Sequence, residues 1–181
     1  MQRYDVAIVG GGLAGLTLSL ALKQQGLRIC LIEKTSPALA QDQAENLAQK
    51  STDGRAHALA YTSQVFYERL GLWDELKAFA EPFKAMQLFD GEGLSSKPLL
   101  SFDSAELGSA GPGLLGYIIE NQGFRSVLEQ RAKTELGPDY LQGFDASMTS
   151  QSSAMKQLSL TSADQSLSIE AQLVVACDGR G

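Results

Sequence analysis

A glycine-rich turn near the start of the chain constrains its fold more than any other feature. Its three glycines share the spacing G-x-G-x-x-G: Gly10, Gly12 and Gly15. An uninterrupted apolar run, residues 6–9, precedes the turn, and leucines recur at helical spacing over residues 13–25, before Gly26. A second apolar run, residues 29–32, follows. Strand, turn, helix and strand in this order predict a parallel βαβ unit and a doubly wound, Rossmann-like α/β fold with a mostly parallel sheet.

Each glycine of this turn has a physical task in a dinucleotide site. Gly10 permits the tight turn, Gly12 lets the backbone approach a pyrophosphate, and Gly15 allows the helix to pack closely on the strand. The helix that starts at Leu13 and Ala14 offers N–H groups and the positive end of its dipole to the phosphates. The segment therefore predicts a dinucleotide site, against the alternative of a glycine turn with no ligand.

The second strand ends in a carboxylate, Glu33, which follows Gly15 by 18 positions. A carboxylate there accepts hydrogen bonds from the adenosine ribose hydroxyls and would repel a ribose 2′-phosphate. The dinucleotide at this site is therefore expected to be FAD or NAD rather than NADP. Lys34, the next residue, is a further candidate contact.

The charge of the chain argues against a nucleic-acid ligand. The formal net charge is -6 and the lysines and arginines are scattered, whereas nucleic-acid binding needs a basic face. The two cysteines, Cys30 and Cys177, lie in apolar runs without metal-binding spacing and are interpreted as buried, reduced thiols of a cytoplasmic protein. The only histidine, His57, is interpreted as a structural or surface residue, so no metal site is expected.

The middle of the chain contains a predicted helix. It is capped by Thr62 or Ser63, runs to Leu70 and is stopped by Gly71. Arg55 lies in the connection before this helix, which the parallel-sheet interpretation places at the same sheet edge as the glycine turn. An arginine there can pair with a pyrophosphate in a bidentate manner, and the alternative is an ordinary solvated charge.

The patterns of several other segments predict their secondary structure. Residues 35–54 are polar and rich in Ala and Gln, and they are expected to form a loop or a short helix. Residues 84–103 are interpreted as pieces of antiparallel sheet. Residues 116–119 predict a short strand, and residues 122–136 predict a helix that Asn121 opens.

The last forty residues are predicted to form further strands. Residues 140–169 alternate between polar and apolar and predict a small antiparallel meander. The meander leads into a predicted buried strand, residues 173–177, which ends at Asp178. If that strand is parallel to the first two, Asp178 lies at the carboxyl edge of the sheet, level with the glycine turn and Glu33. Open α/β sheets bind their ligands at this edge.

Four segments besides the glycine turn carry a resemblance to a known family. They are RAHAL from Arg55, LGLW from Leu70, GYIIENQGFRSVL from Gly116 and VVACDG from Val174. In this order and approximate spacing they resemble the FAD-dependent aromatic hydroxylases, and most closely the ubiquinone-biosynthesis hydroxylases, which act on polyprenylated phenols. The resemblance implies a doubly wound FAD domain into which a sheet-based substrate domain is inserted.

The resemblance also implies site residues. Arg55 matches an arginine near the pyrophosphate and ribose of FAD, and Asn121 matches a polar position that faces FAD. Gln122, beside Asn121, is a weaker match. Asp178 and Gly179 match a DG motif that contacts FAD and is linked to the use of the site by the pyridine nucleotide. From the residues alone, Asn121 is also explained as a helix cap.

The chemistry of the resembled family uses NAD(P)H to reduce the flavin and O2 to hydroxylate an aromatic ring. The parent protein is therefore expected to be an FAD-dependent monooxygenase acting on a small aromatic or prenylated phenol. Residues 1–181 are interpreted as an incomplete FAD-binding domain, with residues 84–115 as the start of the substrate-side sheet layer. Because family members continue past the DG turn, this chain alone is expected to retain FAD weakly or not at all and to hydroxylate nothing. No catalytic side chain is assigned.

Two alternatives stay open from the sequence. The first is another FAD-fold oxidoreductase, such as an amine oxidase, a halogenase or a polyprenyl reductase, although Arg55 and the LGLW segment favour the hydroxylases. The second is a non-enzymatic nucleotide-binding module that is complete at 181 residues. Lipidic substrates would also be consistent with peripheral membrane association of the parent or with its membership of a biosynthetic complex.

Overall fold

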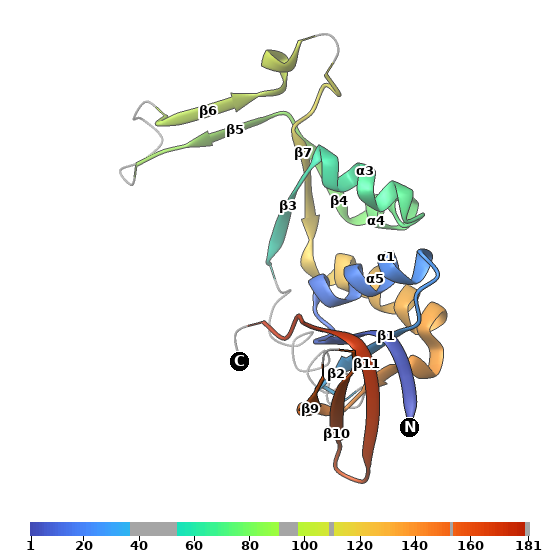
Figure 1. Ribbon diagram of the computed structural model, residues 1–181. Coiled ribbons are helices and arrows are strands. Elements are labelled where there is room, and N and C mark those ends of the chain that lie inside the picture. Colours follow the sequence, from blue (N-terminus) through green and yellow to red (C-terminus); the bar gives the residue numbers. More distant parts are fainter. Residues whose placement is uncertain (37–53, 91–97, 109–110, 153, 180–181) are drawn as a thin grey trace. The chain divides into compact units, whose positions relative to one another are not determined.

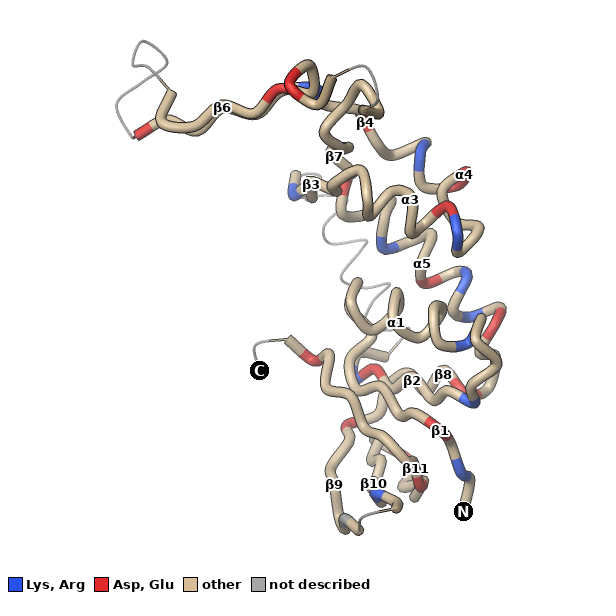
Figure 2. The backbone as a smooth tube through the Cα atoms, turned by 45° about the horizontal axis from the view of Figure 1, so that its top comes forward, with Lys and Arg blue, Asp and Glu red and all other residues tan. Residues whose placement is uncertain are grey.

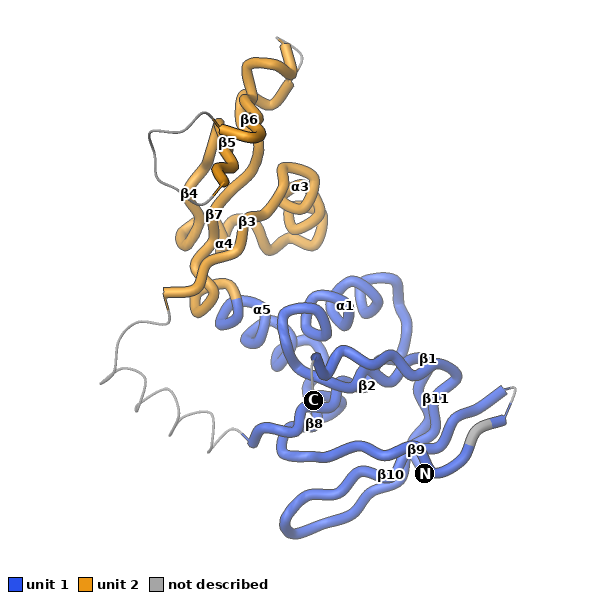
Figure 3. The backbone as a smooth tube through the Cα atoms, turned by 90° about the vertical axis from the view of Figure 1, so that its left-hand side faces the viewer, with its two compact units in different colours: residues 1–53, 125–181 blue, residues 54–124 orange. Residues whose placement is uncertain are grey.

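The computed structural model describes residues 1–36, 54–90, 98–108, 111–152 and 154–179. They form two compact units, which are described separately here. Unit 1 comprises residues 1–53 and 125–181, and unit 2 comprises residues 54–124 (Figure 3). Most of the loop or helix predicted over residues 35–54 lies outside the described residues.

Unit 1 is built on a six-stranded sheet with the order β8-β2-β1-β11-β10-β9 (Figure 1). Its strands are β1 (Gln2–Val9), β2 (Ile29–Glu33), β8 (Tyr140–Gln142), β9 (Asp145–Gln151), β10 (Lys156–Thr161) and β11 (Ser166–Ala176). Strands β8, β2, β1 and β11 are parallel, whereas β9, β10 and β11 pair antiparallel. The predicted α/β class and the predicted meander are both confirmed.

The βαβ unit predicted at the N-terminus is present. Helix α1 (Leu13–Gln24) connects β1 to β2 and buries Leu16 and Leu20. Gly26 has a φ of 80°, the left-handed conformation that ends a helix. The side chains of residues 29–32 are at most 1% exposed, as expected for a parallel strand covered on both faces.

Strand β11 corrects the prediction for the end of the chain. The last strand of the predicted meander and the predicted strand over residues 173–177 are one continuous strand of 11 residues. Residues Ser166–Ala171 pair antiparallel with β10, and residues Ile169–Ala176 pair parallel with β1. The prediction that the final strand is buried is wrong, because Leu173 is 51% exposed. A run of apolar residues does not reveal whether a second layer covers the strand.

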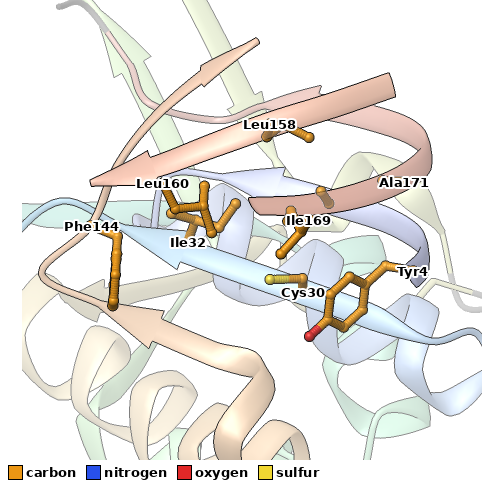
Figure 4. Packing of buried hydrophobic residues seen from close by; sticks show 9 residues of the cluster. Tyr4, Cys30, Ile32, Phe144, Leu158, Leu160, Ile169 and Ala171 are labelled. Atoms are coloured by element: carbon orange, nitrogen blue, oxygen red, sulfur yellow. The ribbon is translucent and has the colours of Figure 1, made fainter. Parts of the chain in front are cut away.

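A buried hydrophobic cluster joins the parallel and antiparallel parts of the sheet (Figure 4). It consists of Tyr4, Ala7, Cys30, Ile32, Phe144, Leu158, Leu160, Ile169 and Ala171. The Tyr4 hydroxyl donates a hydrogen bond to Oδ1 of Asp139, in the 3-10 turn η3 (Gly137–Asp139), at 2.6 Å. Burial and the nearby Asp139 carboxylate raise the pKa of the Cys30 thiol to about 12. Cys30 is therefore a neutral core thiol as predicted, whereas Cys177 is a free thiol that is only half-buried.

Helix α5 (Asn121–Leu136) carries a network of charged side chains beside β8. Glu129 pairs with Lys133 at 2.8 Å and with Arg125 at 3.8 Å, and Gln142 of β8 donates to Glu129 at 3.3 Å. Partial burial opposes ionisation of Glu129. The hydrogen bond and charge of Lys133, followed by the charge of Arg125, outweigh this effect and lower the pKa of Glu129.

We expect Glu129→Gln to lower the free energy of unfolding by about 1 kcal/mol at neutral pH. The pKa of this carboxyl is lower in the folded state than its unfolded value of about 4.3, so its contribution is present above that value and is lost as the pH falls through the folded-state pKa. Chemical denaturation of the wild type and of Glu129→Gln, at neutral and at acidic pH, measures this difference in the free energy of unfolding.

Glu135→Gln is the matched control for this prediction. It removes an i,i+4 pair with Arg131 at 3.5 Å on the same helix, for which a loss of at most about 0.5 kcal/mol is expected. Equal losses in the two variants, or a Glu129→Gln loss that does not change with pH, would contradict the prediction.

Unit 2 contains a three-stranded antiparallel sheet with the order β3-β7-β4. Its elements are β3 (Ala56–Ala60), α3 (Tyr61–Arg69), α4 (Trp73–Leu76), the 3-10 turn η1 (Lys77–Phe79), β4 (Ala80–Phe83), the 3-10 turn η2 (Ser104–Leu107) and β7 (Gly116–Glu120). Gly71, with a φ of 69°, follows α3 as predicted. Leu72 and Trp73 of the LGLW segment are buried, and the Trp73 ring lies 4.7 Å from the ring of Tyr117. This segment therefore forms part of the core of unit 2.

The predicted caps of the helix after Arg55, Thr62 and Ser63, are wrong. Helix α3 begins at Tyr61, and its N-cap residue Ala60 makes no side-chain capping hydrogen bond. The helix follows directly from β3, a strand that the sequence interpretation did not include. Pairing within the sheet sets the start of this helix, and no polar cap is needed.

Strands β5 (Ala85–Leu88) and β6 (Leu100–Asp103) form a separate antiparallel ribbon in unit 2, which confirms the sheet pieces predicted over residues 84–103. One face carries four apolar side chains that are 46–54% exposed: Met86, Leu88, Leu100 and Phe102. The other face carries Ala85, Gln87, Ser101 and Asp103. The ribbon is therefore amphipathic.

Candidate functional site

The carboxyl ends of three parallel strands meet at one edge of the sheet in unit 1. Val9 of β1 pairs with Ile32 of β2 and with Ala176 of β11. The Gly10 N–H donates to the Ile32 carbonyl at 2.7 Å, and the Cys177 N–H donates to the Val9 carbonyl at 2.6 Å. The glycine turn follows β1, Glu33 is the last residue of β2 and Asp178 lies just after β11, so their predicted placement at a common edge is confirmed.

The three glycines of the turn have two different roles. Gly10 has a φ of 108°, and a Cβ there would overlap the Cys177 carbonyl. A Cβ on Gly15 would overlap the Gly10 carbonyl oxygen and lie 3.4 Å from the Cys177 Cβ. A Cβ on Gly12 would meet no atom within 4 Å. Gly10 and Gly15 are therefore required for packing, whereas Gly12 faces open space, where a phosphate can approach the backbone.

Glu33 is tied to the glycine turn by its carboxylate. Its Oε2 accepts the N–H of the buried Gly11 at 2.6 Å, and its Oε1 accepts the N–H of Thr35 at 2.8 Å. An ionised carboxylate has about four lone-pair sites, so both oxygens can still accept a ribose hydroxyl. The sequence predicts the position of this carboxylate, but not that it also holds the turn in place.

The N-terminus of α1 supplies the electrostatics of the turn. Gly12 is the N-cap residue, and its carbonyl accepts the N–H of Leu16 at 2.9 Å. Leu13 is half-buried and Ala14 is exposed. No charged side chain lies on the first turns of this helix (Figure 2). The attraction that this helix itself offers an anion therefore comes from its backbone N–H groups and its dipole.

The other predicted residues of unit 1 follow β2 and β11 at the same edge of the sheet. Nζ of Lys34 forms an exposed ion pair with Asp145 at 2.9 Å. Asp178 and Gly179 are exposed at the end of β11, and Gly179 has a φ of 78°. Burial, followed by the charge of Asp178, raises the pKa of the Cys177 thiol. The cofactor contacts assigned to Lys34, Asp178 and Gly179 stay predictions.

Unit 2 brings the remaining candidates together. The Asn121 N–H donates to the Arg55 carbonyl at 3.0 Å, and Oδ1 of Asn121 lies 2.9 Å from Nε2 of His57. Gln122 is exposed on the same first turn. Helix α5 begins at Asn121 itself, one residue earlier than predicted. The contacts of Arg55, Asn121 and Gln122 with a cofactor stay predictions, and the partnership of His57 has no signal in a single sequence.

The residues of unit 1 fit a dinucleotide. Gly12 presents open backbone at a helix N-terminus, and Glu33 holds a carboxylate at the strand end where a ribose would lie. Within the described part of the chain, no group of three or more His, Cys, Asp or Glu side chains is placed to hold a metal ion. None of the described helices is long and apolar enough to cross a membrane.

Comparison with known proteins agrees with this geometry. The chain is 34% identical over 181 residues to ubiquinone hydroxylase UbiL of Rhodospirillum rubrum, covering 97% of this chain and 37% of that protein. It is 32% identical over 130 residues to 3-demethoxyubiquinol 3-hydroxylase of Escherichia coli, covering 71% of this chain and 30% of that protein. The chain thus spans well under half the length of these relatives.

A solved structure shows the same fold. The p-nitrophenol 4-monooxygenase PnpA of Pseudomonas putida DLL-E4 superposes with a TM-score of 0.74 at 20% identity, over 99% of this chain and 42% of that one. The family described as an FAD binding domain matches residues 3–181. That match spans almost the whole chain and includes the glycine turn and Glu33. This chain is therefore a member of the FAD binding domain family.

Proposed function

We propose that this chain is the FAD-binding part of a flavin-dependent monooxygenase that hydroxylates an aromatic substrate. The observation that carries the proposal is the glycine turn, in which Gly12 is open to a ligand and Glu33 is bonded to the backbone of Gly11. Support comes from ubiquinone hydroxylase UbiL of R. rubrum and 3-demethoxyubiquinol 3-hydroxylase of E. coli, each of which is similar to most of this chain. The activity is proposed for the whole protein.

The chain's own residues would bind and orient the cofactor. Backbone N–H groups at the start of α1 would hold the pyrophosphate at Gly12, and Glu33 would accept the ribose hydroxyls. Further contacts are assigned to Lys34, Arg55, Asn121, Gln122, Asp178 and Gly179 by the resemblance described above. No described side chain is assigned a proton transfer.

The reaction chemistry would come from FAD, which when bound takes electrons from NAD(P)H and passes them to O2. NAD(P)H is proposed as the reductant because the resembled hydroxylases use it. A carboxylate at Glu33 would repel a 2′-phosphate, which argues against NADP at the glycine turn, and membership of the FAD binding domain family favours FAD over NAD there. This leaves NAD(P)H as a second, transient ligand.

The substrate is proposed to be a polyprenylated phenol of the ubiquinone pathway. Two of the similar proteins are named for ubiquinone or demethoxyubiquinol hydroxylation. The amphipathic ribbon β5–β6 is consistent with residues 84–115 being the start of the substrate-side sheet layer, because its apolar face suits a prenyl chain or a covering layer. A cytoplasmic protein that approaches the membrane from its surface would reach such a substrate.

Oxygen consumption by the full-length gene product tests this proposal. With FAD and NAD(P)H present, a prenylated phenol is expected to stimulate oxygen uptake and to gain one hydroxyl group, measured by mass spectrometry. An amine and an unsubstituted prenyl alcohol serve as control substrates. Oxygen uptake driven by the amine instead, or no flavin in the purified protein, would contradict the proposal and favour an amine oxidase or a non-enzymatic module.

A further inference from the structure

His57 has a defined polar partner, although the sequence interpretation treats it as structural or surface. Strand β3 reads AHALA, so His57 is its only residue with a polar side chain. Its Nε2 lies 2.9 Å from Oδ1 of Asn121, the first residue of α5. A carboxamide oxygen can only accept, so Nε2 carries the proton and donates it.

The backbone holds the two residues in register. Strands β3 and β7 pair antiparallel with His57 opposite Ile119, and α5 follows β7 directly. The Asn121 N–H donates to the Arg55 carbonyl at 3.0 Å. Arg55 therefore fixes the backbone of Asn121, while His57 fixes its side chain.

Phe124 also contacts the imidazole. Its ring lies 6.3 Å from the His57 ring in an edge-on arrangement, and Tyr67 packs edge-on against Phe124 at 5.3 Å. Residues three apart on a helix lie on the same face, so Asn121 and Phe124 contact His57 from one face of α5. The His57 side chain is itself exposed, so burial in a core does not explain its position.

We propose that His57 is the positioning residue of Asn121. A planar carboxamide presents either its oxygen or its NH2 group, depending on which way it is turned. The hydrogen bond from His57 holds the carboxamide oxygen on the imidazole side. With the carboxamide in this orientation, its NH2 group would be the end that donates to the flavin nucleotide. The inference rests on the proposed function, in which Asn121 contacts FAD, and it adds a residue that the resemblance leaves unassigned.

Four variants of the full-length gene product test the inference by FAD titration, read from the change in flavin fluorescence: His57→Leu, His57→Gln, Asn121→Ala and the double variant of His57→Leu with Asn121→Ala. His57→Leu removes the donor and is expected to weaken FAD binding roughly 3- to 10-fold, the value of one hydrogen bond. His57→Gln carries an amide nitrogen at the same number of bonds from the backbone and is expected to stay within about 2-fold of wild type. Adding His57→Leu to Asn121→Ala is expected to weaken binding no further, because the carboxamide is already gone.

The outcomes separate the inference from the proposed function. If wild type binds FAD and His57→Leu binds it equally well, or if His57→Gln is as weak as His57→Leu, the positioning role is wrong. Wild type that does not bind FAD at all overturns the proposed function itself. Nitrogen-15 NMR of the ligand-free protein gives a readout independent of flavin: the imidazole proton is expected on Nε2, and a proton on Nδ1 alone would overturn the inference. Unchanged unfolding free energies in all variants exclude a loss of fold.

Discussion

Replacing Gly15 by alanine is expected to destabilise unit 1 by about 2–4 kcal/mol. The added Cβ would overlap the Gly10 carbonyl oxygen, so α1 must move away from the sheet. This obstacle belongs to the main chain and cannot rotate aside. Chemical denaturation measures the loss, and FAD binding is expected to fall with it.

Gly12→Ala is the matched control for this substitution. A Cβ on Gly12 meets nothing within 4 Å, and its φ of -75° suits alanine, so the unfolding free energy should change by less than about 1 kcal/mol. FAD affinity should nevertheless fall roughly 10-fold or more, because the methyl group occupies the space left for the pyrophosphate. If Gly15→Ala is as stable as Gly12→Ala, the assignment of separate packing and binding roles is wrong.

The second large effect is expected at Glu33. Glu33→Ala leaves the N–H groups of Gly11 and Thr35 without their acceptor, which should cost about 2 kcal/mol of stability and weaken FAD binding roughly 10- to 100-fold. Glu33→Gln keeps one accepting oxygen and should fall between wild type and Glu33→Ala in both measurements. Denaturation and FAD titration of the same preparations check the two effects together.

Asp145→Ala is the control for the Glu33 prediction. It also removes a carboxylate, but one whose side chain is 60% exposed and pairs with Lys34 at 2.9 Å. A loss of at most about 0.5 kcal/mol and no change in FAD affinity are therefore expected. If Glu33→Ala binds FAD with wild-type affinity, the proposed hydrogen bonds between this carboxylate and the ribose hydroxyls are wrong. A loss of affinity in Asp145→Ala would instead support a cofactor contact by Lys34.

The first βαβ unit is predictable from sequence because each of its signals is local. Residues 29–32 form an unbroken apolar run, and they are fully buried in β2. Gly26 is needed where the helix ends, and it adopts the left-handed conformation there. The order of the elements then places Glu33 and Asp178 at one sheet edge, since parallel strands present their carboxyl ends on the same side.

The elements that sequence reasoning missed are those that tertiary pairing creates. Strand β3 reads AHALA, and alanine favours helices, yet the segment is extended because it pairs with β7. The sequence interpretation divides strand β11 in two because its polar–apolar alternation gives way to a continuous apolar run after Gln172. In the structure β10 pairs with residues 166–171 and β1 with residues 169–176, so the two segments form one strand. The His57–Asn121 bond joins residues 64 positions apart, so no local pattern could reveal it.

FAD titration of the full-length gene product, in wild-type and Gly12→Ala forms, tests the central claim most directly. The claim is that the glycine turn of this chain binds the flavin nucleotide. It predicts saturable binding of one FAD per wild-type chain and affinity at least about 10-fold weaker in the variant, with the unfolding free energy unchanged within about 1 kcal/mol. No binding by wild type, or equal affinity in the two forms, would contradict it.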